Sequence, residues 1–404
     1  MKAKLFLMAA AAMTLATSCS NDEVVLQNNA GNQIAFTAVS ENASRAATAY
    51  CNNNLPGDFD VWSSVGGATY FGGVNYSNAN PNTAGSTWTV TNVENQRYWP
   101  NQEKINFYAA KNYGTCKAWD PATGTLSFDF SVKGTVGEQE DFIYAVQTDV
   151  QRDPKDNVST QALNFRHALS QVVFQAKNTN SKLYVEVSGV EVHNVKNAGT
   201  YTLPTASTTD NIESHDQSAE DTANRGTWGN TVTGNATYSV DFTAVPLSAT
   251  LASLTTADDT EKAGEWNGNT MLLMPQTTAA KDVATRSEFG KNDGAYFVLD
   301  VCIWNVAGDN VDKEKDVMLV GTKTIAEGQE TTYKTAKVYI PVSIAWEQGK
   351  KYTYTFIFGK GNGGYNQDGN DVLVPITFNV TVDDFVANSD TQVGMDEIYE
   401  KQGN

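Results

Sequence analysis

Apolar and polar residues alternate along most of this chain. In residues 351–358, Tyr352, Tyr354, Phe356 and Phe358 share one face, and threonines occupy the other. A period of two is typical of a half-buried strand. The same pattern predicts further strands over Ile34–Val39, Phe59–Val65, Ile105–Ala109, Leu126–Phe130, Phe142–Val146, Gln171–Ala176, Leu183–Val187, Thr237–Phe242, Met271–Met274, Ala295–Trp304, Lys337–Val342 and Phe378–Val382.

These segments are rich in β-branched and aromatic residues, and clusters of Gly, Asn, Asp, Ser and Thr separate them. Long helical patterns are nearly absent. Many short strands with turn signals between them predict an all-β fold built from antiparallel sandwiches. The polar segment Gln151–Gln161 divides the strands into two groups and is the expected linker. A second polar segment, Thr205–Asn235, is expected to form a long surface loop of the second domain.

The N-terminus has the layout of a secretory signal peptide. Lys2 and Lys4 precede an uncharged run over 5–15, and small residues then lead to Cys19. The run is shorter than the ~20 residues that a membrane-spanning helix needs. A cysteine directly after small residues resembles a lipobox, in which the thiol is acylated and becomes the new N-terminus. The polar, acidic residues after Cys19 resemble the export signal of Bacteroidetes surface lipoproteins.

Composition narrows the classes of partner. Acidic residues outnumber basic ones by 46 to 28, for a net charge of -18, which argues against nucleic acid and anionic lipid as partners. Cys51, Cys116 and Cys302 permit at most one disulfide, and their spacing matches no zinc site. Ordinary thiols are the favoured interpretation.

Catalytic signatures are absent from the sequence. It contains neither H-E-x-x-H nor G-x-S-x-G. Gly359, Gly361 and Gly364 satisfy G-x-G-x-x-G, but turn residues follow where a phosphate-binding helix would begin, so we expect a hairpin loop. His167 lies among apolar residues and is expected to be a structural histidine at a domain junction. We therefore expect no catalytic residue, no metal and no cofactor.

Four motifs resemble those of the fimbrillin family, the subunits of Bacteroidetes type V fimbriae. They are F-R-H-A-L-S-Q-V-V-F at 165–174, Y-W-P at 98–100 with the strand that follows, W-E-Q-G-K-K-Y-T-Y at 346–354, and the closing strand at 376–385. The resemblance implies two transthyretin-like antiparallel β-sandwich domains in tandem. The expected divisions are a signal peptide at 1–18, a lipidated propeptide with the first strand at 19–45, sandwiches at 46–160 and 161–386, and a tail at 387–404.

The resemblance also implies a route of assembly. In the family's stalk subunits, an arginine-specific protease removes the first strand with the lipidated N-terminus, and a neighbour's strand refills the groove. Here Ile34, Phe36 and Ala38 share one face of the first predicted strand, and a polar loop follows. By carry-over from the family, the cut is expected between Arg45 and Ala46.

The donor strand is expected in the C-terminal tail. Val393 and Met395 alternate as a donor strand requires, whereas Ile398 and Tyr399 break the alternation. Met395, Ile398 and Tyr399 fit a short amphipathic helix equally well, so both interpretations of the tail stay open.

The leading hypothesis is a non-enzymatic fimbrial subunit at the outer membrane and cell surface. Its expected partners are other fimbrial subunits, the arginine-specific protease and a host surface ligand, with the membrane reached only through lipid on Cys19. The alternative is a tip adhesin or a permanently lipidated surface protein that binds a host ligand or glycan. Aromatic residues near the first strands, more often core than surface, could form its binding face: Trp62, Tyr70, Phe71 and Tyr76. A secreted hydrolase is disfavoured because convergent acidic groups are missing.

Overall fold

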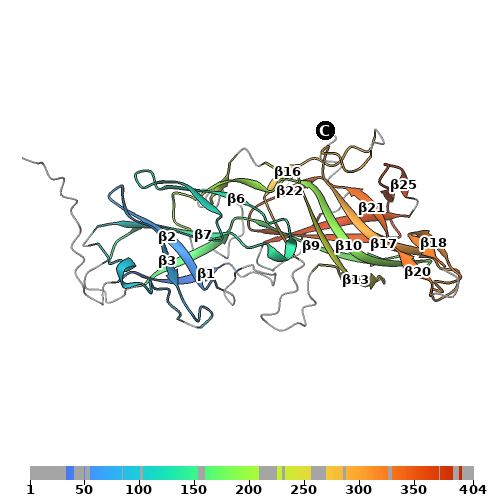
Figure 1. Cartoon of the computed structure of the whole chain (residues 1–404), viewed down its shortest axis with the longest axis horizontal. Helices are drawn as coiled ribbons and strands as arrows, with labels where there is room; N and C mark the ends of the chain where they lie inside the picture. Colours follow the sequence, from blue (N-terminus) through green and yellow to red (C-terminus); the bar gives the residue numbers. More distant parts are fainter. Residues whose placement is uncertain are drawn as a thin grey trace, which may run out of the picture.

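The computed structural model describes residues 33–40, 50, 55–83, 85–100, 103–152, 160–208, 225–229, 233–255, 270–284, 288–325, 330–372, 374–384 and 391–393. The molecule is elongated, with the N-terminal strands in one lobe and the C-terminal strands in the other (Figure 1). Helical structure in the described residues is limited to the 3-10 turns η2 (Val93–Asn95) and η3 (Val136–Glu138). The prediction of an all-β fold with tandem β-sandwiches is confirmed.

The first sandwich packs a six-stranded sheet against a four-stranded one. The larger sheet has the order β1 (Ala35–Ser40), β8 (Thr160–His167), β7 (Ile143–Val150), β4 (Ile105–Lys111), β2 (Asp58–Val65) and β3 (Ala68–Ser77). The smaller sheet has the order β12 (Thr227–Trp228), β11 (Ala198–Thr202), β6 (Thr125–Ser131) and β5 (Thr115–Asp120). Trp62 of β2 joins the two layers, since its ring lies 5.4 Å from that of Phe128 in β6.

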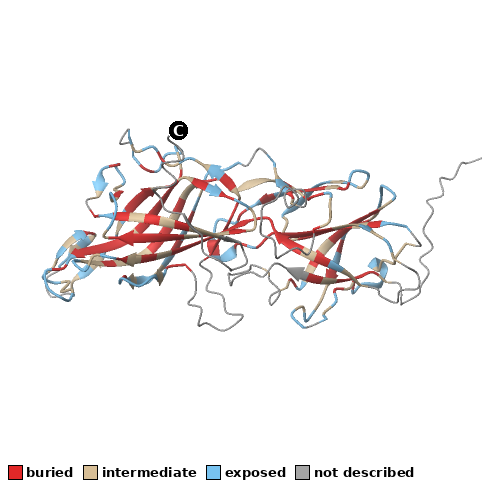
Figure 2. Cartoon of the chain, turned by 180° about the vertical axis from the view of Figure 1, so that it is seen from behind, coloured by how far each residue is buried: buried red, intermediate tan, exposed pale blue. Residues whose placement is uncertain are grey.

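The second sandwich holds the remaining strands. One sheet has the order β13 (Ala236–Pro246), β10 (Leu183–Val195), β17 (Tyr296–Asn305), β21 (Ala336–Pro341), β24 (Gly364–Tyr365) and β25 (Asp371–Val372), with β18 (Val317–Val320) also on β17. The other has the order β14 (Ala252–Ser253), β9 (Ser170–Asn178), β23 (Lys350–Phe358), β26 (Ile376–Asp384) and β27 (Thr391–Val393), with β15 (Met271–Leu273) also on β9. Two small ladders pair β16 (Gln276–Thr278) with β22 (Ile344–Trp346), and β19 (Thr322–Thr324) with β20 (Thr332–Lys334). Buried residues run through both lobes (Figure 2).

The sheets cross the division expected between residues 160 and 161. β8 pairs with β1 and β7, so the expected linker at 151–161 instead joins two strands of one sheet. β12 belongs to the segment 205–235, yet it pairs with β11, which pairs with β6. Residues 205–208 and 225–229 therefore lie on the first sandwich and not in a loop of the second. Alternation marks a strand but carries no information about which sheet it joins.

Two pairings depart from the expected antiparallel arrangement. β1 runs parallel to β8, and β23 runs parallel to β9. Parallel neighbours need a long crossover connection. The chain provides it by building most of a sandwich between the two partners in each case.

The chain passes from the first sandwich to the second at Ala168–Ser170. The backbone N–H of Gly349 donates to the carbonyl of Leu169 at 2.8 Å, and Ser170 Oγ donates to the carbonyl of Glu347 at 2.7 Å. Trp228 Nε1 donates to the carbonyl of Ala168 at 2.8 Å. The crossover is thus held by groups from both sandwiches.

Contacts between charged side chains around Glu191, on β10, give the stability of the second sandwich a predictable pH dependence. The Glu191 carboxylate accepts a hydrogen bond from His193 Nε2 at 2.5 Å and pairs with Lys337. Mainly through the His193 hydrogen bond, these contacts lower the pKa of Glu191 from 4.5 to about 2. Because the folded-state pKa lies below the unfolded one, this stabilisation is present above about pH 4.5 and is lost as the pH falls toward 2.

Glu191→Gln removes the charged contacts of this carboxylate and is expected to lower the free energy of unfolding at pH 7. The expected loss is only about 1 kcal/mol, because partial exposure screens the pair. It should also flatten the loss of stability between about pH 4.5 and pH 2. Urea denaturation at a series of pH values measures both effects. Glu288→Gln, at an exposed position in the same sandwich, is the control. A pH profile parallel to that of the unmodified protein would contradict the assignment.

Candidate functional site

β1 is the most deeply buried edge element of the first sandwich. Ile34 and Phe36 have no exposed surface, and Ala38 is 7% exposed. The predicted inward face is therefore present in the structure; on the opposite face, Thr37 is partly exposed and Ala35 is buried. All three inward side chains join one cluster of buried residues, here called the first core: Ile34, Phe36, Ala38, Phe59, Val61, Phe71, Val74, Tyr76, Trp88, Val90, Ile105, Phe107, Ala109, Ile143, Ala145, Leu163 and Phe165.

Backbone hydrogen bonds hold β1 on both edges. On one edge it pairs with β8, from Ala35 opposite Thr160 to Ser40 opposite Phe165. On the other edge, Phe36 and Trp88 exchange two hydrogen bonds, of 3.0 and 2.8 Å. The N–H of Ile34 also donates to the carbonyl of Arg97 at 2.8 Å. We call residues 88–98 the clasp.

The clasp also closes the sheet around the first core. Thr89 bridges Ser77 at the far edge of the six-stranded sheet, next to the bridge between Trp88 and Phe36. The clasp thus connects the two edge strands, β1 and β3, and β1 completes the enclosure. We call the surroundings of β1, formed by β8, the clasp and the first core, its socket. Without β1, the edge of β8, the inner groups of the clasp and the apolar floor would face water, each at a free-energy cost.

Phe36 is the central contact between β1 and that floor. Its ring centroid lies 4.7 Å from that of Tyr76 and 5.1 Å from that of Phe107, both edge to face. Phe59 lies 6.2 Å away. Such aromatic contacts add to the stabilisation from burial alone.

The chain is anchored again shortly after β1. Asp141 Oδ2 accepts hydrogen bonds from the N–H of Tyr50 at 3.0 Å and from His167 Nδ1 at 2.8 Å. Both side chains of the Asp141–His167 pair are fully buried. His167 is therefore a hydrogen-bonded structural residue beside the junction, as predicted. Its partner lies 26 residues earlier in the chain and was missed, because no sequence spacing links the two.

The remaining predicted site residues have different positions. Cys19, Arg45, Ala46 and Met395 lie outside the described residues. Val393 ends β27, where its Cα is paired with that of Val380 in β26. The tail strand is thus paired with its own sandwich, far from β1 along the chain.

A fimbrillin-like family model matches residues 20–384, most of the sequence. The chain belongs to the fimbrillin-like family. Among solved structures, it is similar to a fimbrial protein from Bacteroides vulgatus, with 14% identity and a TM-score of 0.47, over 88% of this chain and 100% of that one. It is also similar to a "putative cell adhesion protein" from Bacteroides ovatus, with 14% identity and a TM-score of 0.43, over 89% and 100%. No curated protein matches it in sequence.

The structure gives two of the fimbrillin motifs a physical role. Y-W-P begins at Tyr98, which ends the clasp and bridges Gln33 ahead of β1. F-R-H-A-L-S supplies Phe165 to the first core, His167 to the buried pair and Ser170 to the crossover. The motifs therefore secure the socket of β1 and the junction between sandwiches.

The aromatic residues considered as a ligand-binding face are mostly interior. Trp62, Phe71 and Tyr76 are at most 6% exposed. Tyr70 is partly buried, and its hydroxyl donates to the carbonyl of Tyr98 at 2.6 Å. These four residues therefore contribute to packing within the first sandwich.

Other forms of chemistry find little support in the part of the chain that the structure describes. There, Cys116 and Cys302 are free thiols, and no group of three or more His, Cys, Asp or Glu side chains is placed to hold a metal ion. Nor does this part contain a helix long and apolar enough to cross a membrane. A cavity of about 350 Å³ lies beside Asp58, Lys111 and Tyr113. Asp58 and Lys111 already form an ion pair with each other there, with Lys111 Nζ 2.7 Å from Asp58 Oδ1.

Proposed function

We propose that this fimbrillin-like chain is the precursor of a fimbrial subunit, exported as a lipoprotein through Cys19, cut between Arg45 and Ala46 and polymerised by donor-strand exchange. Membership of the family supports a fimbrial or adhesive role at the cell surface. The observation that carries the finer proposal is β1, a strand held in a closed socket and followed five residues later by Arg45. The outer membrane is the proposed anchoring site of the precursor.

The proposed mechanism begins at the segment after β1, which links β1 covalently to the rest of the chain. A cut at Arg45 separates β1 from Tyr50, which stays attached to the sandwich through Asp141. β1 is then held only by its hydrogen bonds and by burial of Ile34, Phe36 and Ala38. A strand from another subunit can replace it, restoring the ladder and the core. Because the donor and acceptor surfaces differ, the contact repeats head to tail.

A second candidate is a tip adhesin or a permanently lipidated surface protein. One observation favours it: the tail strand β27 is already paired with β26 of the same chain. A subunit whose tail stays there could accept a donor strand without donating one. Its ligand would bind elsewhere than on the buried aromatic residues of the first sandwich.

Treating the purified precursor with an arginine-specific protease tests the proposal. We expect a cut at Arg45, followed by ladders that resist SDS. Arg45→Ala and Arg45→Lys should both prevent the cut and the ladders, and the lysine variant controls for loss of charge. Cleavage without ladders would favour the tip adhesin. Ladders formed by the uncut variants would overturn the mechanism.

A further inference from the structure

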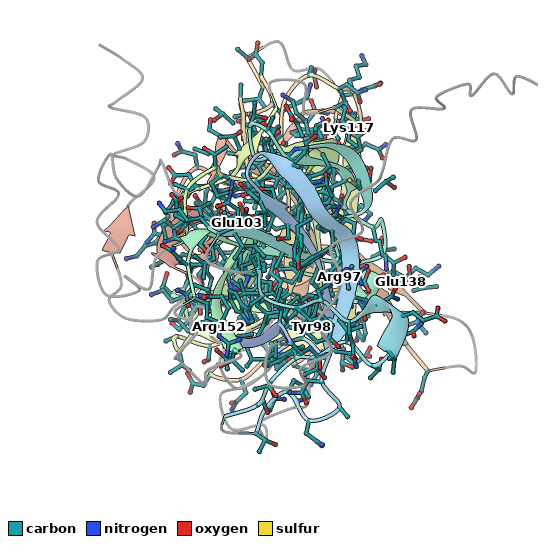
Figure 3. The ribbon with its side chains drawn as sticks, turned by 90° about the vertical axis from the view of Figure 1, so that its left-hand side faces the viewer. Arg97, Tyr98, Glu103, Lys117, Glu138 and Arg152 are labelled. Atoms are coloured by element: carbon teal, nitrogen blue, oxygen red, sulfur yellow. The ribbon has the colours of Figure 1, made fainter. Side chains whose placement is uncertain are left out.

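The cavity beside Asp58 and Lys111 lies at one end of the first sandwich. The start of β2 and the turn after β4 form one side of it, and the end of β6 with the loop that follows forms the other. Lys111 lies opposite Ile143, which lies opposite His167, so this is the end at which the chain crosses to the second sandwich. The far end of the first sandwich faces the viewer in Figure 3, where Arg97 is labelled.

The size of the cavity suits a small ligand. Its volume of about 350 Å³ falls at the lower end of the range of roughly 300–1,000 Å³ that is usual for small-molecule sites. This space remains although Asp58 and Lys111 already form their ion pair in its wall. Such sites combine apolar walls with a few fixed polar groups, and both are present here.

Aromatic side chains form the apolar part of the wall. Tyr113, which is partly exposed, and Phe130 both line the cavity. The ring of Tyr113 is held in place by the interior, because its centroid lies 4.6 Å from that of Phe128 and 5.4 Å from that of Trp62. The ring therefore offers a fixed surface for the apolar C–H groups of a ligand.

Two carboxylates in the wall are fixed by neighbouring donors. Asn75 Nδ2 donates to Asp58 Oδ2 at 3.0 Å and to Asp60 Oδ1 at 2.9 Å, and the Tyr113 hydroxyl donates to Asp60 Oδ2 at 2.5 Å. Burial acts to raise the pKa of Asp58, but hydrogen bonds from Lys111 and Asn75 outweigh it and lower that pKa. Asp58 is therefore ionised at neutral pH, and each of the four oxygens keeps a further lone pair that can accept a hydrogen bond.

Hydrogen-bond donors lie in the same wall. The Lys111 ammonium has three N–H groups, and its pair with Asp58 uses one of them. Across the cavity, Lys133 Nζ lies 2.7 Å from Glu140 Oε2, and about half of each of these side chains is exposed. The cavity therefore presents donors and acceptors side by side.

This mixture of charges disfavours a charged ligand. Three carboxylates and two ammonium groups line the cavity, so an anion meets the carboxylates and an organic cation meets the ammonium groups. Among the described residues, no three His, Cys, Asp or Glu side chains are placed to hold a metal ion. A hydroxyl group, in contrast, both donates and accepts, and it carries no charge.

We propose that this cavity binds one sugar residue of a neutral glycan, with the C–H face of the sugar against Tyr113 and its hydroxyls between Asp60 and Lys111. Both requirements of such a ring, an apolar surface and paired donors and acceptors, are met within one space. The inference goes beyond the proposed function, because every group that it uses lies outside β1. It applies equally to a stalk subunit and to a tip adhesin.

Calorimetric titration of the uncut precursor with neutral methyl glycosides tests the proposal. The probes are the methyl glycosides of glucose, galactose, mannose and N-acetylglucosamine. At least one should bind, with a dissociation constant of about 1 mM, as expected for a ligand of this size. N-acetylneuraminic acid and spermidine serve as charged probes. Failure of all four neutral glycosides, or tighter binding of either charged probe, would overturn the proposal.

Filling the cavity should abolish this binding. Ser131 ends β6, lines the cavity and is exposed, so Ser131→Trp adds bulk there without removing a buried contact. We expect binding of the same glycoside to weaken at least about tenfold. Thr91→Trp, at an exposed position of the same sandwich away from the cavity, should change it less than about twofold. Thermal unfolding confirms that both variants fold, and undiminished binding by folded Ser131→Trp would contradict the site.

A second pair of variants tests the carboxylate. Asp60→Asn keeps the size of the side chain and removes a charged acceptor, so binding should weaken about tenfold. The control is Asp129→Asn, because Asp129 also accepts hydrogen bonds from a lysine and a hydroxyl but lies outside the cavity wall. Equal weakening by both variants would show a general effect of charge and would refute the assignment.

The outcome is separable from that of fimbrial assembly. Binding is measured on uncut protein, so absence of ladders after the protease cut would overturn the proposed function and leave the sugar site standing. Absence of sugar binding would overturn the site and leave assembly standing.

Discussion

Phe36→Ala is expected to destabilise the precursor by about 3–5 kcal/mol. The side chain is fully buried, and its ring contacts Tyr76 and Phe107, so its removal leaves a cavity in the first core. Denaturant unfolding of the intact precursor, followed through aromatic fluorescence, measures the loss. The same variant should release β1 faster after the cut at Arg45.

The stability of the Phe36→Ala precursor is to be compared with that of the same variant after cleavage and assembly. Once β1 has been exchanged for another strand, residue 36 is no longer present, so the assembled protein should be as stable as the unmodified one. Phe107→Ala, in β4 of the same core, should destabilise both forms by a similar amount. If Phe36→Ala weakened the assembled form as strongly as the precursor, β1 would have to be a permanent part of the protein.

Asp141→Ala is expected to lower the free energy of unfolding by about 3–5 kcal/mol, because it breaks the fully buried pair with His167. The substitution leaves His167 Nδ1 and the N–H of Tyr50 without the carboxylate that both contact. Tyr50 lies five residues after Arg45 in the chain, so loss of this contact should also speed cleavage at Arg45. Urea denaturation and the rate of limited proteolysis measure the two effects.

The neighbouring acidic residue provides the control. Glu140 pairs with Lys133, and about half of each side chain is exposed. Glu140→Ala should therefore lower stability by less than about 1 kcal/mol and leave the cleavage rate unchanged. Similar losses for both variants would show that the effect is general to this loop and does not come from the buried pair.

The candidate site was predictable in part. Alternation alone marked Ile34, Phe36 and Ala38 as one face of a strand, and the structure places all three in the first core. Asp141 carried no such signal, because its role comes from His167 and from the N–H of Tyr50, which contact it only in the folded protein.

The sequence by itself determined that this chain forms many short strands and, for the strands that it marked, which side chains face inward; it did not mark β3, β5, β8 or β11. Those properties are local, because successive side chains of a strand point to opposite faces. Only the tertiary structure decided which strands pair: that β8, β11 and β12 complete the first sandwich, that β1 lies parallel to β8, and that the clasp closes over it. Pairing depends on contacts between residues far apart in the chain, and many partners satisfy the same alternation. The socket of β1 is such a non-local product, assembled from five other strands and a loop.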